Sequence, residues 1–453
     1  MEIQNKKIMV IGAGKSGKET VKVLNNLGYN VAIQDKAQED DIDPKFLAYI
    51  EKECIVGIFG DNNFDPCEYD LLVVSPGVPL DLPFIKSAKL NGIDVIGELE
   101  LAYLLSHGSY IGITGTNGKT TTTTLVGEIF KNSGKNTKVV GNIGVPAISV
   151  SVKSEEDDIF VTEISSFQLE SINTFRPKIA AILNITPDHL NRHKTFEAYV
   201  DAKSRIFMNQ TENDYLIINW DDPCDREISK KAKSKIIPFS RRMELDFGVY
   251  ISDNTFVVRD EQGIKHEICK LNDLKIIGEH NMENALAAIA ISYFGNVDKD
   301  IIAKTIRSFK GVEHRLEYVG NVDKVDFYND SKGTNLDATL TAIKALKNNI
   351  ILIAGGDAKS QDFSPLGAAL ETQIKALVLI GRDKEMIEKV ANASNFKEVY
   401  KEKDMNEAVL RAVSIAESGD KVLLSPACAS WDMYDNYEQR GRHFKESVNR
   451  LLK

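Results

Sequence analysis

Three regions of the chain repeat one order of local structure: an apolar, strand-like run, a glycine-rich turn, and a stretch with helical character. The first occupies residues 6–28 and the second residues 111–130, while the region after residue 320 holds apolar runs that end in glycine, serine, aspartate or lysine. Short β-branched runs that alternate with helical stretches are typical of parallel sheets covered by helices. The 453 residues also exceed the size of one hydrophobic core. The sequence therefore predicts an α/β protein with three domains.

The three domains are predicted to divide the chain at residues 97 and 311. Residues 1–97 are expected to form an N-terminal Rossmann-like domain, and residues 98–311 a central domain with a P-loop ATPase-like α/β fold. Within the central domain, residues 247–269 alternate apolar and polar side chains around Asp-Asn and Gln-Gly turns, which predicts small antiparallel hairpins. Two helices are predicted to follow, in the stretches NMENALAAIAISYFG and KDIIAKTIRSF. Residues 312–453 are predicted to form a second Rossmann-like domain. Because ligands bind at the carboxyl ends of such strands, the three domains can share one cleft.

The charge and cysteine content exclude some classes of partner. Lysine and arginine total 56 against 66 aspartate and glutamate residues, so the net charge of -10 offers no long-range attraction for nucleic acid or an anionic membrane. The five cysteines form no CxxC pair, which is typical of reduced thiols in a cytoplasm. No run reaches the roughly 20 apolar residues that a membrane helix requires. We therefore expect a cytoplasmic protein.

The stretch GTNGKTT, residues 115–121, is the strongest candidate for a ligand site. A strand, a glycine turn and a helix N-terminus in this order direct backbone N–H groups at an incoming phosphate. Lys119 would reach the β- and γ-phosphates and the Thr120 hydroxyl would help to hold Mg²⁺. The strict phosphate-loop pattern requires glycine where this chain has Ile113, so the match is partial. The alternative is a tight strand-to-helix connection without a ligand.

A second glycine motif, GAGKSG, follows the first strand. Gly12, Gly14 and Gly17, with Asp35 at the end of the next strand, fit a dinucleotide fingerprint. The motif alone suggests an NAD-dependent dehydrogenase. However, the same geometry serves any nucleotide diphosphate, because the helix end recognises phosphate and the carboxylate recognises a ribose or a base.

Three polar residues follow apolar strands of the predicted central domain. Glu163 could hold Mg²⁺ beside the phosphate loop, and Asp188 and His189 follow another strand, so their side chains are expected to converge. His189 and His193 could share a helix face, yet no HExxH glutamate accompanies them, which argues against zinc. For each residue taken singly, the alternative is a capping or solvated side chain. Lys203 taken alone is a surface lysine on an amphipathic helix.

Eight motifs in the order found here resemble those of the Mur ligases of peptidoglycan synthesis. The resemblance extends from Lys6 to the C-terminal helix, and two of its stretches, SPACASWD and NDSKGTN, look like those of the member that adds D-glutamate. The motifs are TGTNGKTTTT, TEISSFQLE, NITPDHLNRH, GEHNMENALAA, EHRLE, NDSKGTN, GGDAKSQDF and SPACASWDMYDNYEQRG.

The resemblance implies an ATP-dependent acid–amino-acid ligase that forms a C–N bond and releases ADP and phosphate through an acyl phosphate. The implied substrates are UDP-N-acetylmuramoyl-L-alanine and D-glutamate, in the cytoplasmic synthesis of peptidoglycan precursors. The implied protein is a monomer that needs neither nucleic acid nor a membrane as a partner.

The resemblance also implies which residues bind ATP and two Mg²⁺ ions. Lys119, His189 and a carbamylated Lys203 would be catalytic. One Mg²⁺ would use Thr120 and Glu163, and the other would use His189 and Lys203. The implied ATP contacts are Gly115, Thr116, Asn117, Gly118, Lys119, Thr120, Thr121, Asn281, Arg315 and Asp330.

The remaining implied residues bind the two other substrates. The N-terminal domain would hold the UDP moiety, Asn142 would contact the sugar–peptide portion, and the C-terminal domain with Asp188 would hold D-glutamate. The implied contacts of the UDP substrate are Gly14, Lys15, Ser16, Asp35, Lys36, Ser75, Gly77 and Asn142. Those of D-glutamate are Asp188, Lys332, Thr334, Lys359, Ser430 and Tyr437.

Two rival functions remain open at this point. A nicotinamide-dependent oxidoreductase built on GAGKSG would leave Lys119, Glu163 and the NDSK and GGDAKS stretches without a role. A non-catalytic, nucleotide-binding regulator would bind ATP without turning it over.

Overall fold

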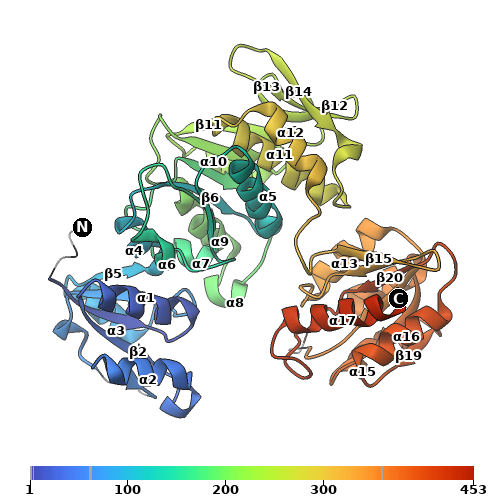
Figure 1. The fold of residues 1–453 in the computed structure, drawn as a ribbon, viewed down its shortest axis with the longest axis horizontal. Coiled ribbons are helices and arrows are strands. Elements are labelled where there is room, and N and C mark those ends of the chain that lie inside the picture. The colour runs from blue at the N-terminus through green and yellow to red at the C-terminus, as the bar shows by residue number, and fades with distance from the viewer. Residues whose placement is uncertain (1–2, 4, 61–63, 359–360, 453) are drawn as a thin grey trace. The chain divides into compact units, whose positions relative to one another are not determined.

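The structure is a computed structural model that describes residue 3 and residues 5–60, 64–358 and 361–452. These residues form three β-sheets, each covered by helices, and this confirms the predicted three-domain α/β class (Figure 1). By their internal contacts the residues group into two units, 1–273 with 282–307, and 274–281 with 308–453. The first unit holds two of the sheets and the second unit holds the third.

The N-terminal sheet is parallel throughout, with the strand order β3-β2-β1-β4-β5. Its strands are β1 (Lys7–Ile11), β2 (Asn30–Asp35), β3 (Val56–Phe59), β4 (Leu71–Val74) and β5 (Asp94–Gly97), and its helices α1 (Lys15–Asn26), α2 (Pro44–Lys52) and α3 (Pro83–Leu90). Strands β1 and β4 are almost fully buried, because helices cover both faces of the sheet. This is the predicted Rossmann-like arrangement.

The turn after β1 requires glycine at two positions. Gly12 has a φ of 96°, which favours glycine, and a Cβ on Gly17 would lie 1.8 Å from the Gly12 carbonyl oxygen. Helix α1 therefore packs closely against the turn, and its N-terminus points toward the carboxyl end of the sheet.

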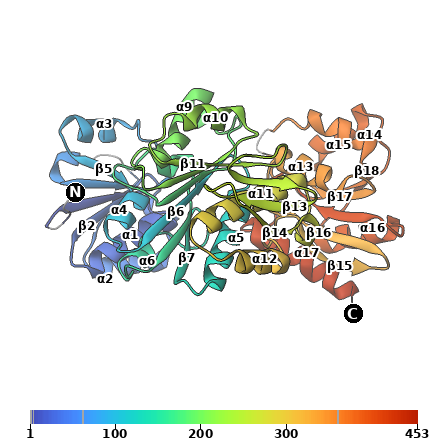
Figure 2. The ribbon, with the colours of Figure 1, turned by 90° about the horizontal axis from the view of Figure 1, so that it is seen from above.

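The central sheet has nine strands in the order β14-β13-β12-β11-β10-β9-β6-β8-β7. They are β6 (Ser109–Thr114), β7 (Thr137–Gly141), β8 (Ile159–Glu163), β9 (Ile179–Ile182), β10 (Tyr215–Asn219), β11 (Lys235–Ser240), β12 (Gly248–Ser252), β13 (Thr255–Arg259) and β14 (Lys265–Lys270). The helices before residue 230 are α4 (Glu98–Leu104), α5 (Lys119–Asn132), α6 (Ile148–Ser151), α7 (Ser166–Leu169), α8 (Leu190–His193), α9 (Phe196–Ser204) and α10 (Pro223–Ser229). Helices α9 and α10 cover one face of the sheet and α5 the other (Figure 2).

The predicted hairpins are confirmed at one edge of this sheet. Strands β12, β13 and β14 pair antiparallel, and Asp253 and Asn254 form the first turn with φ values of 46° and 59°. Both residue types tolerate this conformation, which suits a two-residue hairpin. Helices α11 (Glu279–Phe294) and α12 (Lys299–Ser308) follow, where the sequence predicts two helices.

The third sheet has the order β15-β16-β20-β17-β18-β19, and only β15 pairs antiparallel among its described strands. The strands are β15 (Glu317–Val322), β16 (Val325–Asn329), β17 (Ile350–Ala354), β18 (Ile374–Leu379), β19 (Val399–Lys401) and β20 (Lys421–Leu424). The helices are α13 (Leu336–Leu346), α14 (Gly367–Thr372), α15 (Lys384–Ala393), α16 (Met405–Ile415) and α17 (Tyr437–Leu451). Apolar clusters fill both sides of this sheet.

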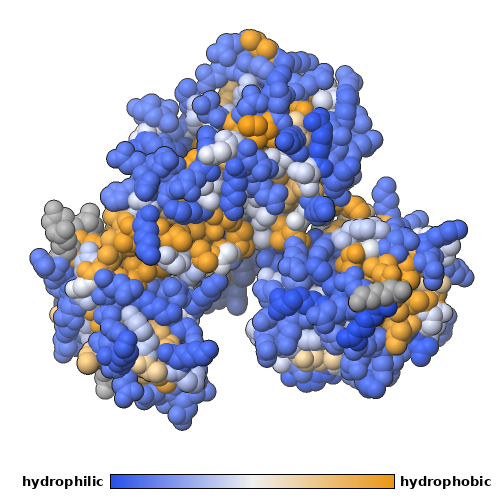
Figure 3. Space-filling model, in the orientation of Figure 1, coloured by the Kyte–Doolittle hydropathy of each residue, from blue (hydrophilic) through white to orange (hydrophobic). Residues whose placement is uncertain are grey.

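The surface agrees with the charged composition. On the face shown in Figure 3, hydrophilic residues cover most of the molecule, and hydrophobic residues gather over β5, α4, α6 and α7. Among the helices that the structure describes, none combines the length and apolar character needed to cross a bilayer. All five cysteines are free, as predicted.

Candidate active site

The predicted phosphate loop lies where a strand, a tight turn and a helix meet. Strand β6 ends at Thr114, and α5 begins at Lys119 after a turn in which Gly118 has a φ of 83°. A Cβ on Gly118 would lie 2.2 Å from the Asn284 Oδ1 atom, so glycine fits both the backbone conformation and the space. At the N-terminus of a helix such as α5, the backbone N–H groups point out of the helix end, in the geometry that binds a phosphate.

A neighbouring strand fixes the shape of this loop. After β9, the carbonyl oxygen of Asn184 accepts a hydrogen bond from the Thr116 N–H at 2.9 Å, and its side-chain oxygen accepts one from the Asn117 N–H at 2.9 Å. The Tyr199 hydroxyl lies 3.2 Å from the Thr116 Oγ1 atom. Neither Asn184 nor Tyr199 was among the predicted site residues. The position of Asn184, directly after a buried strand, was the available signal.

Two lysine side chains converge on the carbonyl oxygen of Gly115. The Lys119 ammonium donates to the carbonyls of Gly115 and Thr116, both at 2.8 Å, and Lys203 donates to the Gly115 carbonyl at 2.8 Å. Lys203 is only 1% exposed, so its interpretation as a surface lysine is wrong. Burial first, and then the charge of Lys119, lowers the pKa of Lys203 well below its usual value.

Glu163 occupies the end of β8, next to the phosphate loop. Strand β6 lies between β8 and β9, and Ile113 pairs with Glu163. The carboxylate is 2% exposed, and its Oε1 atom accepts a hydrogen bond from the Asn142 side chain at 2.8 Å. Its Oε2 atom is buried and has no hydrogen-bond partner among the described residues. A buried carboxylate oxygen in this state fits a hard cation such as Mg²⁺.

Asp188 and His189 lie on the exposed segment between β9 and α8. The His189 Nε2 atom is 3.6 Å from an Asp188 carboxylate oxygen, and its ring lies 6.5 Å from the ring of Tyr199. His189 precedes α8 with a φ of 52°, and its ring and that of His193 both pack against the Phe167 ring, at 5.0 and 5.5 Å. His193 is instead buried, 2.9 Å from the Ser166 hydroxyl, which supports a structural role.

The strand ends of the N-terminal sheet line a cavity of about 470 Å³. Its walls carry both the glycine turn and apolar side chains such as Leu82 and Phe84, a combination that suits a nucleotide. The Asp35 carboxylate accepts hydrogen bonds from the N–H groups of Ala13 and Ala37, so it also stabilises the turn. The predicted residues that line the cavity are Gly14, Lys15, Ser16, Asp35, Lys36, Ser75 and Gly77.

In the second unit, the described residues that were predicted to bind D-glutamate lie on the two loops that follow β16 and β20. The Lys332 ammonium lies 5.5 Å from the centre of the Tyr437 ring, and Ser430 is buried. Thr334 is on the same loop as Lys332, and Lys359 lies outside the described residues. Trp431, directly after Ser430, is 65% exposed.

Arg440, on α17, joins these two loops, and the sequence analysis did not identify it. Its guanidinium is 1% exposed and donates to the carbonyls of Ser331 at 2.9 Å and Cys428 at 3.1 Å. It also donates to the Ser331 hydroxyl at 3.0 Å, and that hydroxyl donates to the Tyr437 carbonyl. The planar guanidinium therefore fixes the backbone of both loops.

The three residues expected near the adenine and ribose, Asn281, Arg315 and Asp330, all belong to the second unit. Burial raises the pKa of Asp330 to about 6, and its carboxylate accepts hydrogen bonds from the Ser425 hydroxyl and the Leu316 N–H. Their role toward ATP stays a prediction.

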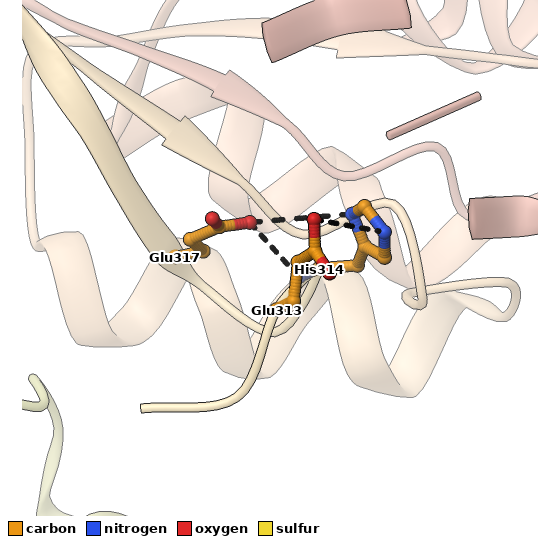
Figure 4. A group of neighbouring side chains, drawn as sticks. All are labelled: Glu313, His314 and Glu317. Carbon is orange, nitrogen blue, oxygen red and sulfur yellow. Dashed lines mark hydrogen bonds and ion pairs between the residues drawn. The ribbon is translucent and has the colours of Figure 1, made fainter. Parts of the chain in front are cut away.

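Glu313, His314 and Glu317 form the group of possible metal ligands in Figure 4. The Lys445 ammonium contacts both carboxylates, at 3.0 and 2.5 Å, and the Asn329 amide lies 2.9 Å from the His314 Nδ1 atom. Both carboxylates are thus already paired with one lysine, and Glu317 is the first residue of β15.

The phosphate loop, the buried carboxylate at the neighbouring strand end and the nucleotide-sized cavity are features of α/β enzymes that bind a nucleotide triphosphate. Family models match most of the chain: "Mur ligase MurD-like, N-terminal domain" over residues 6–97, "Mur ligase middle domain" over 113–292 and "Mur ligase, glutamate ligase domain" over 314–428. The chain belongs to the Mur ligase family.

Curated relatives and solved structures agree with this family. A UDP-N-acetylmuramoylalanine--D-glutamate ligase of Alkaliphilus metalliredigens is 48% identical over 453 residues, which are 100% of this chain and 99% of the relative. The enzyme of the same name from Clostridioides difficile is 47% identical over 452 residues, 100% of both chains. The UDP-N-acetylmuramate-alanine ligase MurC of Thermotoga maritima has a similar fold, with a TM-score of 0.59, 19% identity, and coverage of 98% of this chain and 100% of that one.

Proposed function

We propose that this chain joins D-glutamate to UDP-N-acetylmuramoyl-L-alanine with hydrolysis of ATP to ADP and phosphate, in the cytoplasmic synthesis of peptidoglycan precursors. The observation that carries the proposal is that the loop with Lys119 and the buried carboxylate of Glu163 lie at the carboxyl ends of two neighbouring strands of the central sheet, β6 and β8. The near-identical length and close similarity of relatives with this activity support it.

A carboxylate does not condense with an amine in water, because oxide is a poor leaving group. In the proposed reaction, an oxygen of the L-alanine carboxylate attacks the γ-phosphorus of ATP and ADP leaves. The D-glutamate amine then attacks the acyl phosphate, loses a proton, and expels inorganic phosphate. Both steps depend on positioning and on stabilisation of negative charge.

The phosphate loop supplies most of this stabilisation. The N–H groups at the start of α5 would bind the phosphates of ATP, and Lys119 would leave the carbonyls of Gly115 and Thr116 to contact the γ-phosphate. Thr120 and Glu163 would hold one Mg²⁺, through the Glu163 oxygen for which the described part of the chain offers no hydrogen-bond partner. When bound, the ion neutralises charge on the transferred phosphoryl group.

Lys203 is the proposed site of carbamylation. An amine reacts with CO₂ only after it loses its proton, and burial lowers the pKa of Lys203 well below its usual value. The product would be an anion with two oxygens, suited to a second Mg²⁺ together with His189. We propose two metal sites on this basis.

The other substrates are assigned by domain, with the division at residues 97 and 311. The 470 Å³ cavity of the N-terminal domain would hold the UDP moiety, and Asn142 would contact the rest of that substrate. The C-terminal domain would bind D-glutamate through Lys332, Thr334, Lys359, Ser430 and Tyr437, with Asp188 from the central domain. ATP would extend to Asn281, Arg315 and Asp330, and the enzyme would act as a monomer.

The decisive experiment measures phosphate release from ATP by the purified protein with Mg²⁺. We expect release only when both UDP-N-acetylmuramoyl-L-alanine and D-glutamate are present, and little with L-glutamate, L-alanine or L-lysine. ATP binding without release would favour the non-catalytic regulator. Calorimetry with NADH and with UDP tests the oxidoreductase, which requires tight NADH binding.

A further inference from the structure

Helix α4 carries two buried carboxylates directly after the N-terminal sheet. Glu98 is 2% exposed and Glu100 is 1% exposed, although both open a short helix whose neighbours are mostly apolar. Buried carboxylates cost free energy unless they accept hydrogen bonds. The partners of each carboxylate therefore indicate what it contributes.

Glu100 contacts a loop of the central domain outside the site. Its carboxylate accepts hydrogen bonds from the backbone N–H groups of Asn173, Thr174 and Phe175 at 2.7–2.9 Å, and from the Thr174 hydroxyl. Both oxygens are used, and none of the predicted site residues lies on this loop. Glu100 is therefore a structural carboxylate.

Glu98 contacts a different segment, residues 141–148. Its Oε1 atom accepts a hydrogen bond from the Ile148 N–H at 2.7 Å, at the start of α6, and its Oε2 atom is buried without a hydrogen-bond partner among the described residues. The chain before Ile148 is the GNIGVPA stretch, which carries Asn142. Glu98 thus anchors the end of a loop that contains a predicted site residue.

The loop formed by residues 141–148 contacts both proposed nucleotide sites of the first unit, the one at Glu163 and the one at Lys15. The Asn142 backbone N–H donates to the Glu163 carbonyl at 2.9 Å, and the Asn142 side chain donates to the Glu163 Oε1 atom at 2.8 Å. Two residues further on, the Gly144 carbonyl accepts a hydrogen bond from the Lys15 ammonium at 2.8 Å, and Lys15 lines the 470 Å³ cavity.

The helix that carries Glu98 is itself held firmly. The Gly97 N–H donates to the Ser171 carbonyl at 3.0 Å, and a Cβ on Gly97 would lie 2.2 Å from the Ser171 hydroxyl oxygen. Hydrophobic residues gather over β5, α4, α6 and α7 (Figure 3), and α4 packs against α6. A carboxylate on a helix held in this way can fix the position of the loop to which it is hydrogen-bonded.

We propose that Glu98 is a positioning residue of the ligase site, which acts through residues 141–148 to orient the Asn142 amide and hence the Glu163 carboxylate. This inference rests on the proposed function. The Asn142 amide holds one oxygen of the Glu163 carboxylate, and the other is buried without a hydrogen-bond partner among the described residues, so the amide sets the orientation of the oxygen left for a cation. Because the Asn142 loop also contacts Lys15, the same anchor serves the sugar–peptide part of the UDP substrate.

Three variants test this role: Glu98→Ala removes the acceptor, Glu98→Asp shortens it, and Glu98→Gln keeps an acceptor oxygen at the same reach. Glu100→Ala is the matched control, because it removes an equally buried carboxylate from the same helix. Calorimetry measures the affinity for a non-hydrolysable ATP analogue with and without Mg²⁺, and the affinity for UDP. Thermal unfolding and steady-state kinetics are measured on the same samples.

We expect Glu98→Ala and Glu98→Asp to lower the Mg²⁺-dependent affinity for the analogue by about 10-fold, as other partners of metal-binding carboxylates do. The KM of the UDP-muramoyl substrate should rise by a similar factor, while UDP affinity stays within about twofold. Glu98→Gln should restore both values. Glu100→Ala should lower the unfolding temperature and change neither.

The inference is overturned if Glu98→Asp matches the wild type in Mg²⁺-dependent affinity, or if Glu100→Ala shows the same loss as Glu98→Ala. Should Glu98→Ala fail to fold, the Asp and Gln pair still decides the question. The binding measurements need no turnover, so a wild-type protein that releases no phosphate would refute the proposed function without deciding the role of Glu98.

Discussion

Single residues decide the chemistry at the phosphate loop, where Lys119 and Lys203 share the carbonyl oxygen of Gly115. Two ammonium groups on one oxygen repel each other, and this repulsion is part of why the pKa of Lys203 is lowered. Lys203 is the more deeply buried of the two, and its lowered pKa favours the neutral amine that the proposed carbamylation requires.

The first prediction concerns Lys119. Lys119→Ala removes the charge that would stabilise the γ-phosphoryl group, so we expect phosphate release to fall by at least about 100-fold. UDP binding, measured by calorimetry, should be unchanged because its cavity lies in the N-terminal sheet. Lys131→Ala, at the exposed end of the same helix, is the control and should keep full activity. Loss of UDP binding in Lys119→Ala would contradict the assignment of two separate sites.

The second prediction concerns pH and Glu98. Burial raises the pKa of Glu98 to about 7 from 4.5, although the N–H groups of Ile148 and Ala147 oppose the change. Since the folded protein holds this proton more tightly than the unfolded chain, the stability that it contributes is present below pH 4.5 and is lost as pH rises through 7. The loss is about 3 kcal/mol.

Urea unfolding at pH 4.5 and pH 8 checks this value against Glu98→Gln, which cannot titrate. The wild type should lose more stability than the variant over this range. Equal pH dependence in both proteins would mean that the carboxylate is not buried in solution.

The phosphate loop around Lys119 could be predicted from the sequence, but Lys203, taken alone, was wrongly predicted to lie on the surface. The phosphate loop is local, because its strand, turn and helix are consecutive, and so it could be predicted. Lys203 lies four residues after Tyr199 and three before Ile206, both buried on the apolar side of α9 and the turn that follows. Residues at this spacing share a helix face, so a lysine there was a signal of burial that the amphipathic pattern already contained.

At the scale of elements, α17 organises the second unit. Like Lys203, Arg440 is a charged residue on the buried face of its helix, and neither burial was predicted. Arg440 lies four residues before the buried Phe444, a spacing that places both side chains on one face of α17. By contrast, the predicted hairpins after residue 247 and the two helices that follow were confirmed, because turn residues and helical periodicity are local signals. Arg440 contacts Ser331, which is 109 residues away in the sequence, and Cys428, which is 12 residues away. No local sequence pattern predicts these contacts.

The third prediction tests this arrangement with Arg440→Lys. Lysine keeps the charge but cannot span the carbonyls of both loops, so we expect a loss of about 2–3 kcal/mol in stability. The KM of D-glutamate should rise more than the KM of ATP. Arg442→Lys, exposed on the same helix, is the control for thermal unfolding and kinetics. An unchanged KM of D-glutamate would show that the two loops keep their geometry without the guanidinium.

At the scale of the whole molecule, the chain passes three times between the two units, at residues 273–274, 281–282 and 307–308. The proposed reaction needs an acid, a phosphate and an amine in line, and their predicted sites belong to both units. Motion between the units therefore fits the chemistry, and segments at these crossings are where it would be absorbed.

The fourth prediction is that ligands make the chain more compact. Small-angle scattering should show a smaller radius of gyration when the UDP-muramoyl substrate and an ATP analogue with Mg²⁺ are both present. Neither ligand alone should give the full change, because the carboxylate and the γ-phosphate that react are present together only when both ligands are bound. No change with both ligands would count against closure as part of the reaction.

The two tryptophans fall one in each unit, Trp220 after β10 and Trp431 beside Ser430. A Trp220→Phe protein would consequently carry a single indole, exposed to water next to the proposed amino-acid pocket. Its emission should shift to shorter wavelength as that pocket fills, giving an optical titration of the third substrate that needs neither a label nor catalysis.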